Sequence, residues 1–255
     1  MPKLDAETEK KINVLAGWIT AAKQVSALTG AGASVESGIP DFRGKNGLWS
    51  RYDPEEYATI FSFMDDPAKV WKMLAELVEL CEQAEPNPGH VALAQLESMG
   101  MLAGIITQNV DSLHQRAGSK RVIEFHGNCR SLKCQDCFRK YDDVHLYKKD
   151  WPPKCECGGF LRPDVVLFDE QIPVNALRDS KDLAMGSELM LVIGTSAIVM
   201  PACSMPYLTK SNDGKIVEIN TEATAMSGEA DMSIFGRSGA ILPRLLEVLK
   251  ARVDI

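Results

Sequence analysis

The amino-acid sequence predicts an α/β fold, in which a parallel sheet carries helices on both faces. Short apolar segments typical of buried strands alternate with longer segments of helical periodicity, and this order favours parallel strands joined by helices. Several of the predicted strands end in small or polar residues, and sheets of this class bind ligands beyond the carboxyl ends of their strands. At 255 residues, the chain is long enough to bury a large core without disulfides.

The expected elements follow one another along the chain. Residues 6–24 carry apolar side chains at helical spacing, whereas Val25–Thr29 is a short apolar run that ends at Gly30. A proline opens each of the helices expected at 67–83 and 88–98, a position where its missing amide proton is tolerated. Further on we expect strands at 102–107, 122–125, 189–193 and 216–219, and helices at 175–184 and 240–252.

Composition and charge narrow the functional class. The chain carries 28 Lys and Arg against 35 Asp and Glu, a formal net charge of −7. Direct nucleic-acid binding relies on cationic contacts with phosphates, so an acidic chain argues against it, whereas basic peptides are favoured. The N-terminal residues show no secretory pattern, and no apolar run could span a bilayer. We therefore expect a cytoplasmic protein that does not associate with membranes.

A glycine loop follows the first predicted strand. Gly30 and Gly32 would let backbone amides approach a pyrophosphate, but Val35 stands where the usual dinucleotide fingerprint has a third glycine. A tight turn is the alternative interpretation. The next segment places Phe42 and Arg43 between glycines, a composition suited to a mobile lid over a phosphate-bearing ligand. Simple core packing of Phe42 and a solvated Arg43 would explain the same residues.

His126 is the candidate general base. It follows the strand expected at 122–125 and precedes Gly127, and an imidazole with a pKa near neutrality can accept a proton during catalysis. The alternative is a purely structural histidine. His90 and His114 are expected to pack against or cap helices.

A polar cluster ends the strand expected at 102–107. Gln108, Asn109 and Asp111 follow that strand, and burying them without partners would be unfavourable. A ligand that satisfies these groups is one explanation. The other is that Asp111 caps a short helix at 112–116.

Two cysteine pairs lie within residues 128–163, a segment with clustered proline and lysine and little periodicity. The pairs are Cys134 with Cys137 and Cys155 with Cys157. Four thiolates favour a tetrahedral zinc with no open position, which is a structural site. The second pair has one intervening residue instead of the common two, so Cys129 or His145 could replace its fourth ligand. Unpaired reduced thiols are the alternative.

Taken in order, these motifs resemble the sirtuin family along nearly the whole chain. Any one of them could occur by chance, but the ordered set is highly specific. The motifs are Gly30-Ala31-Gly32-Ala33-Ser34, Gly38-Ile39-Pro40-Asp41-Phe42-Arg43-Gly44, Gln108-Asn109-Val110-Asp111, His126-Gly127, the cysteine pairs, Val165-Val166-Leu167-Phe168, Gly194-Thr195-Ser196 and Asn220-Thr221-Glu222.

The resemblance implies a domain organisation and a reaction. Residues 1–127 and 164–255 would form a Rossmann-like NAD-binding domain, residues 128–163 a zinc-binding module, and residues from about 40 to 85 the helical part of the small domain. NAD would lose nicotinamide as the oxygen of an acyl-lysine attacks the ribose. His126 would then take a proton from a ribose hydroxyl, and water would complete the release of free lysine and O-acyl-ADP-ribose.

The same resemblance implies roles for individual residues, with His126 and Asn109 as the catalytic pair. The expected NAD-binding residues are Gly30, Ala31, Gly32, Ser34, Ile39, Asp41, Phe42, Arg43, Gln108, Asn109, Asp111, Gly194, Thr195, Ser196, Asn220 and Glu222. Ile39 and Asp111 would hold the nicotinamide amide, and Phe42 would shield the reactive carbon. Val165 and Phe168 would border the acyl-lysine channel, and an acylated peptide would add as a strand beside Val166.

Two departures from the family pattern bear on the substrate. Asp169 stands where the family usually has glycine, close to the expected peptide groove, so we expect a preference for basic flanking residues. Desuccinylating members carry Tyr-x-x-Arg at the positions of Leu74 and Leu77. These leucines would leave an acidic acyl group unpaired in a dry pocket, so acetyl or longer apolar acyl groups are favoured over succinyl. The leucines could also simply pack the helix.

Three other functions compete with deacylation. Some relatives transfer ADP-ribose from NAD to protein, and the same pocket would serve that reaction. A non-catalytic module that binds NAD or peptide would not need His126 and Asn109. A conventional dehydrogenase is disfavoured by the incomplete glycine fingerprint and by the polar strand end at residues 108–111.

Overall fold

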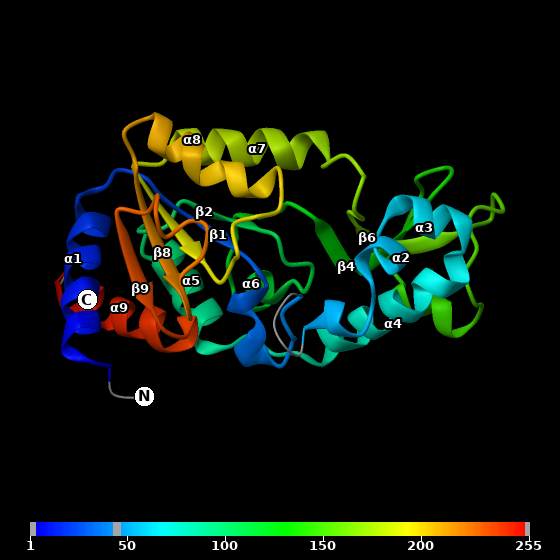
Figure 1. Cartoon of the computed structure of the whole chain (residues 1–255), viewed down its shortest axis with the longest axis horizontal. Coiled ribbons are helices and arrows are strands. Elements are labelled where there is room, and N and C mark those ends of the chain that lie inside the picture. The colour runs from blue at the N-terminus through cyan, green and yellow to red at the C-terminus, as the bar shows by residue number, and fades with distance from the viewer. Residues whose placement is uncertain (1–3, 43–46, 253–255) are drawn as a thin grey trace.

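The computed structural model describes residues 4–42 and 47–252 (Figure 1). Its described residues form a six-stranded sheet and a three-stranded sheet. Figure 1 shows the two sheets towards opposite ends of the long axis, with α1 and α9 together at the outer end of the larger one. No helix in the described part of the chain is long and apolar enough to cross a membrane.

The six-stranded sheet is entirely parallel, as predicted, and its strand order is β3-β2-β1-β7-β8-β9. Its strands are β1 (Val25–Thr29), β2 (Gly104–Thr107), β3 (Val122–Glu124), β7 (Leu189–Ile193), β8 (Lys215–Asn220) and β9 (Met232–Phe235). From β1 the chain adds β2 and β3 on one side of the sheet, and later adds β7, β8 and β9 on the other side of β1. The order therefore reverses between β1 and β7, and a crevice opens beyond their carboxyl ends at such a point.

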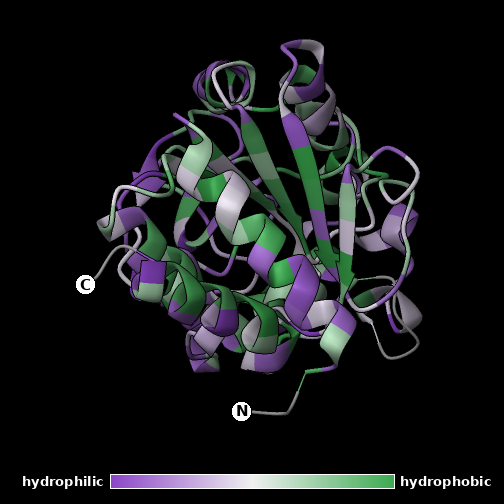
Figure 2. Ribbon diagram, turned by 90° about the vertical axis from the view of Figure 1, so that its left-hand side faces the viewer, coloured by the Kyte–Doolittle hydropathy of each residue, from purple (hydrophilic) through white to green (hydrophobic). Residues whose placement is uncertain are grey.

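Helices cover both faces of this sheet, which confirms the predicted α/β class. On one face, buried side chains of the strands pack against α1 (Ala6–Ala21), α5 (Pro88–Ser98) and α9 (Ser238–Arg252). On the other face they pack against α7 (Val174–Met185) and α8 (Met205–Ser211). Figure 2 shows hydrophobic strands in the middle of the molecule, flanked by helices of mixed character. Burial on both faces explains why β7 is a continuous apolar run; β1 is buried along its whole length as well, although it includes Ser26 and Thr29.

A second core lies around the three-stranded antiparallel sheet, whose order is β5-β4-β6. Its strands are β4 (Gly127–Cys134), β5 (Lys140–Tyr141) and β6 (Leu161–Val165), and its helices are α2 (Pro54–Tyr57), α3 (Ile60–Asp65) and α4 (Pro67–Gln83). Trp71 of α4 is fully buried, and its indole nitrogen donates to the Leu161 carbonyl oxygen at 2.7 Å. This bond joins helix α4 to the smaller sheet, which also contains the cysteine pairs, although the helix is far from the cysteines in sequence.

Most expected elements are present, with shifted ends. The helix expected at 6–24 ends at Ala21, because Ala22 has an extended backbone, and the strand expected at 102–107 begins at Gly104. Helix α6 (Leu113–Arg116) and four of the strands within the larger sheet also match their predicted places. The strand β9 was not predicted. It lies at the sheet edge with only Ile234 buried, so its sequence has no continuous apolar run.

Candidate functional site

A cleft of about 770 Å³ lies beyond the carboxyl ends of the parallel strands. This volume falls within the range of small-molecule and cofactor sites. The cleft is lined by the loops after β1, β2, β7 and β8 and, across from them, by residues that follow β6 and by helix α4. It therefore lies at the point where the strand order reverses, and it reaches into the core around the smaller sheet.

The glycine loop packs tightly against the loop that follows β7. The Gly30 amide donates to the Ile193 carbonyl oxygen at 3.0 Å, and the Gly32 amide donates to Gly194 at 2.8 Å. A Cβ atom at Gly30 would lie 2.7 Å from the Thr195 side chain, and one at Gly32 would lie 2.8 Å from Gly194. Both glycines line the cleft. A side chain at either position would clash with the loop after β7, so this close contact explains why glycine is needed. The tight-turn interpretation therefore accounts for their conformation.

His126 lines the cleft, directly before β4 of the smaller sheet and in contact with Gln108 of the loop after β2. Its Nδ1 atom is 3.2 Å from the Gln108 carbonyl oxygen. A carbonyl oxygen only accepts, so Nδ1 carries the proton of this bond and Nε2 of the neutral ring keeps a free lone pair. Burial lowers the pKa of His126, and the hydrogen bond to Gln108 opposes that shift only in part. The imidazole is thus held neutral and able to accept a proton near neutral pH.

Gly127 brings the smaller sheet against this histidine. Its φ is +75°, and a Cβ atom there would lie 1.9 Å from the Asp164 carbonyl oxygen. The close approach allows the Val166 amide to donate to the His126 carbonyl oxygen at 2.9 Å. The segment that follows β6 therefore runs directly beside the candidate base.

The polar cluster at the end of β2 is satisfied within the protein. The Asn109 side-chain amide donates to the Ser34 hydroxyl at 3.0 Å, and that hydroxyl donates to Asp111 at 2.7 Å. Asp111 also accepts the Leu113 amide at 2.9 Å, at the start of α6. Burial raises the pKa of Asp111, and these hydrogen bonds counter the shift. A ligand is therefore not needed to satisfy these groups. Asp111 accepts the first amide of α6, as the local interpretation expected, although the N-cap position itself is Ser112.

The predicted NAD-binding residues divide into three groups by location. Those that line the cleft are Gly30, Ala31, Gly32, Asp41, Phe42, Gln108, Asn109, Gly194, Thr195, Ser196, Asn220 and Glu222. Ser34, Ile39 and Asp111 are buried and do not belong to the lining. Arg43 lies outside the described residues. The lining also includes Gly236, Arg237 and Ser238 at the start of α9, which sequence reasoning missed because the preceding strand was not recognised.

The substrate side of the cleft is lined by apolar residues from Val165 to Phe168, followed by the carboxylates of Asp169 and Glu170. Val165, Val166 and Phe168 all line it, and both backbone groups of Phe168 pair with the segment that leads into α3, through Ala58 and Ile60. Three residues of α4 also belong to the lining although each is nearly fully buried, which means that they face the cleft from inside the core. They are Met73, Leu74 and Leu77.

The other two buried histidines are structural, as expected. His90 belongs to the capping box at the start of α5, and His114 lies 2.9 Å from the Thr29 hydroxyl. The two rings are 4.8 Å apart between centroids. Burial lowers the pKa of His90 to about 4 and that of His114 well below its usual value.

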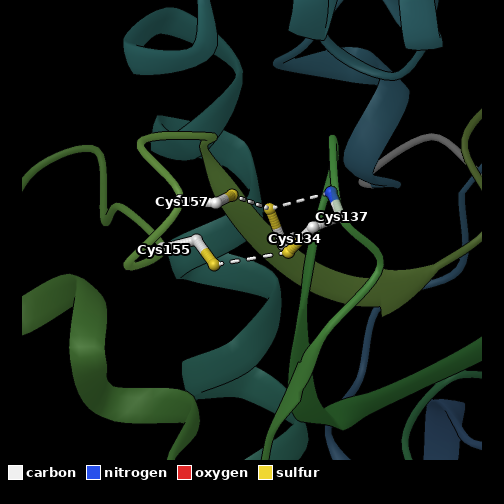
Figure 3. Close-up of side chains that lie close together, drawn as sticks. All are labelled: Cys134, Cys137, Cys155 and Cys157. Atoms are coloured by element: carbon white, nitrogen blue, oxygen red, sulfur yellow. Dashed lines mark hydrogen bonds between the residues drawn. The ribbon is translucent and has the colours of Figure 1, made fainter.

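The four predicted cysteines converge at one end of the smaller sheet (Figure 3). Sγ of Cys134 is 3.5 Å from Sγ of Cys157, and Sγ of Cys137 is 3.6 Å from Sγ of Cys155; all four sulfur atoms lie within 4.8 Å of one another. Four sulfurs at ~2.3 Å from a tetrahedral zinc would be about 3.8 Å apart, so the group fits this metal. The short spacing of the second pair does not keep Cys157 out of the group.

Neither alternative ligand belongs to this cluster. Cys129 is buried in the core around the smaller sheet, and the His145 ring lies 3.0 Å from the Glu82 carboxylate. The segment therefore has one tetrathiolate site for a structural zinc within the described residues.

Comparison with known proteins agrees with this geometry. Residues 30–201 match the model of the Sir2 family. An NAD-dependent protein deacylase 2 of Pyrobaculum aerophilum is 46% identical over 94% of this chain and 96% of its own length. An NAD-dependent protein deacylase of Pyrococcus furiosus is 46% identical over 88% of this chain and 92% of its own.

Solved structures show the same fold. A Sir2 homologue in complex with NAD superimposes with a TM-score of 0.88 and 42% identity, over 98% of this chain and 96% of the other. A Sir2 variant with a deacetylated p53 peptide and 3'-O-acetyl ADP-ribose gives a TM-score of 0.88 and 36% identity, over 92% and 97% of the two chains. The match thus spans both sheets and the cleft between them, and the chain belongs to the Sir2 family.

Proposed function

We propose that this protein removes acetyl or other apolar acyl groups from protein lysines, with NAD as co-substrate and with nicotinamide and O-acyl-ADP-ribose as products. The observation that carries the proposal is that His126, the loops after β1 and β2, and the segment after β6 line one cleft. Relatives of this chain are named NAD-dependent protein deacylases. Bound NAD would supply the ribose carbon that accepts the acyl oxygen.

His126 acts as the general base in this proposal. Its Nδ1–H points to a backbone carbonyl, which leaves Nε2 to accept a proton from a ribose hydroxyl. The backbone bond also fixes the orientation of the ring. Asn109 belongs to the same lining, and its side-chain amide donates to Gly30 and Ser34, which would leave its carbonyl oxygen free to contact the reacting sugar.

The remaining cleft residues would bind the dinucleotide. Residues of the loops after β7 and β8, namely Gly194, Thr195, Ser196, Asn220 and Glu222, would surround the adenosine end. Gln108 would contact the ribose, and its side chain is already oriented by a 3.0 Å hydrogen bond to Thr195. Ser34 and Asp111 would act from behind the lining, by holding Asn109 and the turn at α6 in place. Ile39 packs in the neighbouring core.

The acyl-lysine would enter along Val165, Val166 and Phe168, with its acyl group towards α4. Leu74 is fully buried and Leu77 is 8% exposed, yet both face the cleft. An acidic acyl group would lose its hydration there without gaining a cationic partner, whereas an apolar acyl chain would gain contacts. The proposal therefore favours acetyl and longer apolar groups over succinyl.

Zinc would hold the smaller sheet together and take no part in the chemistry, because four thiolates leave no open position. We propose that residues 128–163 form this zinc module, that residues from about 40 to 85 form the helical part of the same small domain, and that the rest of residues 1–127 and 164–255 forms the NAD-binding part. A reducing compartment such as the cytoplasm suits thiolates that bind metal.

The decisive experiment is a panel of acetyl-, longer acyl- and succinyl-lysine peptides with NAD, comparing wild type with His126→Ala. We expect the variant to lose about 10²- to 10⁴-fold in deacylation while its affinity for NAD is kept, because only the proton acceptor is removed. Succinyl-lysine should be the poorest substrate of the wild type. Mass spectrometry of the products follows both the freed peptide and O-acyl-ADP-ribose.

Two outcomes would refute the proposal. Undiminished turnover by His126→Ala would show that His126 is not the general base. Comparable turnover of succinyl and acetyl peptides would show that the site does not select apolar acyl groups. Transfer of labelled ADP-ribose to protein without loss of an acyl group would indicate ADP-ribosylation instead.

A further inference from the structure

Glu218 is a buried carboxylate in the middle of the larger sheet. It lies on β8 with an exposed fraction of 1%, and its in-register neighbours are Val192 on β7 and Ser233 on β9. Its side chain shares a face of the sheet with Ile216, which packs with Met226 and helices α7 and α8. A carboxylate in such surroundings is costly unless it is fully hydrogen-bonded.

Three hydroxyl groups surround this carboxylate, and no ion pair with it occurs among the described residues. The Thr224 hydroxyl donates to Oε1, while the hydroxyls of Ser227 and Ser233 donate to Oε2 at 2.5 and 2.8 Å. Hydrogen bonds to a charged acceptor are short and strong. Glu218 is therefore satisfied by neutral donors from two places, the loop after β8 and the edge strand β9.

The directions of these bonds are determined by the backbone. The Thr224 hydroxyl accepts the Met226 amide at 3.1 Å, and the Ser227 hydroxyl accepts the Thr224 amide at 2.9 Å. Each hydroxyl has a single proton, so each must give that proton to Glu218. The carboxylate thus closes a ring of hydrogen bonds that holds residues 224–227 in one conformation.

This loop forms one wall of the cleft. Thr221, Glu222 and Thr224 belong to the lining, whereas Glu218, Ser227 and Ser233 do not. Glu218 reaches the cleft only through Thr224, from the side away from the ligand. On the other side of the strand end, Asn220 donates to the Thr195 carbonyl oxygen at 3.0 Å, which joins the wall to the loop after β7.

We propose that Glu218 is a positioning residue for the adenosine end of NAD, acting through Thr224 and Ser227. The inference rests on the proposed function, since it assigns that end of NAD to the wall at residues 221–224. A preformed wall lowers the ordering cost of binding the dinucleotide. Because the ring of His126 is held by the Gln108 carbonyl oxygen and not by this wall, loosening of the wall weakens NAD binding and leaves the chemical step unchanged.

Ser227→Ala and Ser233→Ala form a matched pair for the test. Both remove one hydroxyl donor to the same oxygen of Glu218, but only Ser227 belongs to the loop. We expect Ser227→Ala to raise the KM for NAD about fivefold or more, with kcat and the KM for acyl peptide unchanged, the pattern of a lost binding contribution. Ser233→Ala should lower the melting temperature comparably and leave the KM for NAD within about twofold of wild type.

Glu218→Gln supplies a second variant of nearly the same shape. If its amide oxygen keeps the two serine hydroxyls, its amino group faces Thr224 and offers a donor where an acceptor is needed. We expect it to raise the KM for NAD at least as much as Ser227→Ala. Equal KM values for NAD in wild type and Ser227→Ala, or equal increases in both serine variants, would overturn the proposal in favour of a role in stability alone.

Calorimetric titration with ADP-ribose separates this inference from the proposed function. ADP-ribose retains the adenosine end, and its binding requires no turnover. Weaker ADP-ribose binding by Ser227→Ala than by Ser233→Ala would support the positioning role even if the wild type failed to deacylate any peptide. A wild type that binds neither NAD nor ADP-ribose would overturn both the function and the inference.

Discussion

At the scale of single residues, environment decides what His126 can do. Four histidines occur in the chain, and burial lowers the pKa of three of them. His90 belongs to a helix cap and His114 binds a buried hydroxyl through Nε2, and neither residue lines the cleft. Only His126 combines a neutral ring, a backbone acceptor for Nδ1 and a place in the cleft lining. Its chemistry therefore follows from location as much as from residue type.

The pKa of His126 predicts how turnover depends on pH. Protonation removes the lone pair of Nε2, so kcat/KM should fall as the pH drops through the pKa of His126. Because burial lowers that pKa, the acid limb should have its midpoint below 6.5, with little change between about pH 7 and 8. Initial rates with an acetyl-lysine peptide from pH 5 to 8 measure it. A midpoint at or above 6.5 would contradict the neutral, desolvated imidazole.

At the scale of elements, the segment after β6 is braced from two sides. The fully buried Arg162 donates to the Val165 carbonyl oxygen and pairs with Glu170, which in turn accepts the Leu167 amide at 2.8 Å. Phe168 is paired through its backbone near α3. Removing one partner of a buried ion pair typically lowers the free energy of unfolding by about 3–5 kcal/mol. We therefore expect the pair of Arg162 and Glu170 to hold this segment in one conformation. The segment can then present a fixed edge to a peptide.

Asp169 ends this segment, and its φ of +67° lies where aspartate and asparagine are tolerated better than most residues. Its exposed carboxylate at the cleft should favour peptides with Lys or Arg beside the acyl-lysine. We expect the ratio of kcat/KM for basic over acidic peptides to fall in Asp169→Gly, and equally in Asp169→Asn, which keeps the shape without the charge. Added salt should reduce the wild-type ratio. An unchanged ratio in both variants would exclude a role for this charge.

At the scale of the whole molecule, the cleft needs both sheets. The parallel sheet contributes the loops after β1, β2, β7 and β8, and the smaller sheet contributes the segment after β6 and helix α4. The cysteine cluster lies at the far end of that smaller sheet, where β4 ends and the chain returns towards β6. A zinc ion held there would act on the cleft through the shape of the smaller sheet.

Removal of zinc tests this coupling. We expect chelation with release of one zinc per chain to lower the melting temperature and to abolish deacylation, because the edge beside His126 loses its support. A metal-sensitive dye and differential scanning calorimetry follow the two events. Cys203→Ser is the matched control, since Cys203 lies outside the cluster and should leave zinc content and activity unchanged. Full activity of the metal-free protein would contradict the coupling.

Local pattern by itself determined the fold class and most elements. A continuous apolar run predicted β7 and a mostly apolar run predicted β1, each with the bounds found in the structure. Prolines marked the first residues of α4 and α5. These signals depend only on neighbouring residues in the chain. The paired cysteines likewise indicated the zinc site. The edge strand β9 carries no such signal, and with it the cleft residues at the start of α9 were missed.

Only the tertiary structure decided which polar groups face the cleft and which support it from behind. Ser34, Asn109 and Asp111 are alike in sequence as polar residues near strand ends, yet their mutual hydrogen bonds satisfy them and leave only Asn109 in the lining. The hydroxyls around Glu218 come from positions 224, 227 and 233, and no spacing rule brings them to one carboxylate. Whether such contacts span a few residues, as around Glu218, or more than 70, as between Ser34 and Asp111, only the packing of strands and loops brings the groups within hydrogen-bond distance.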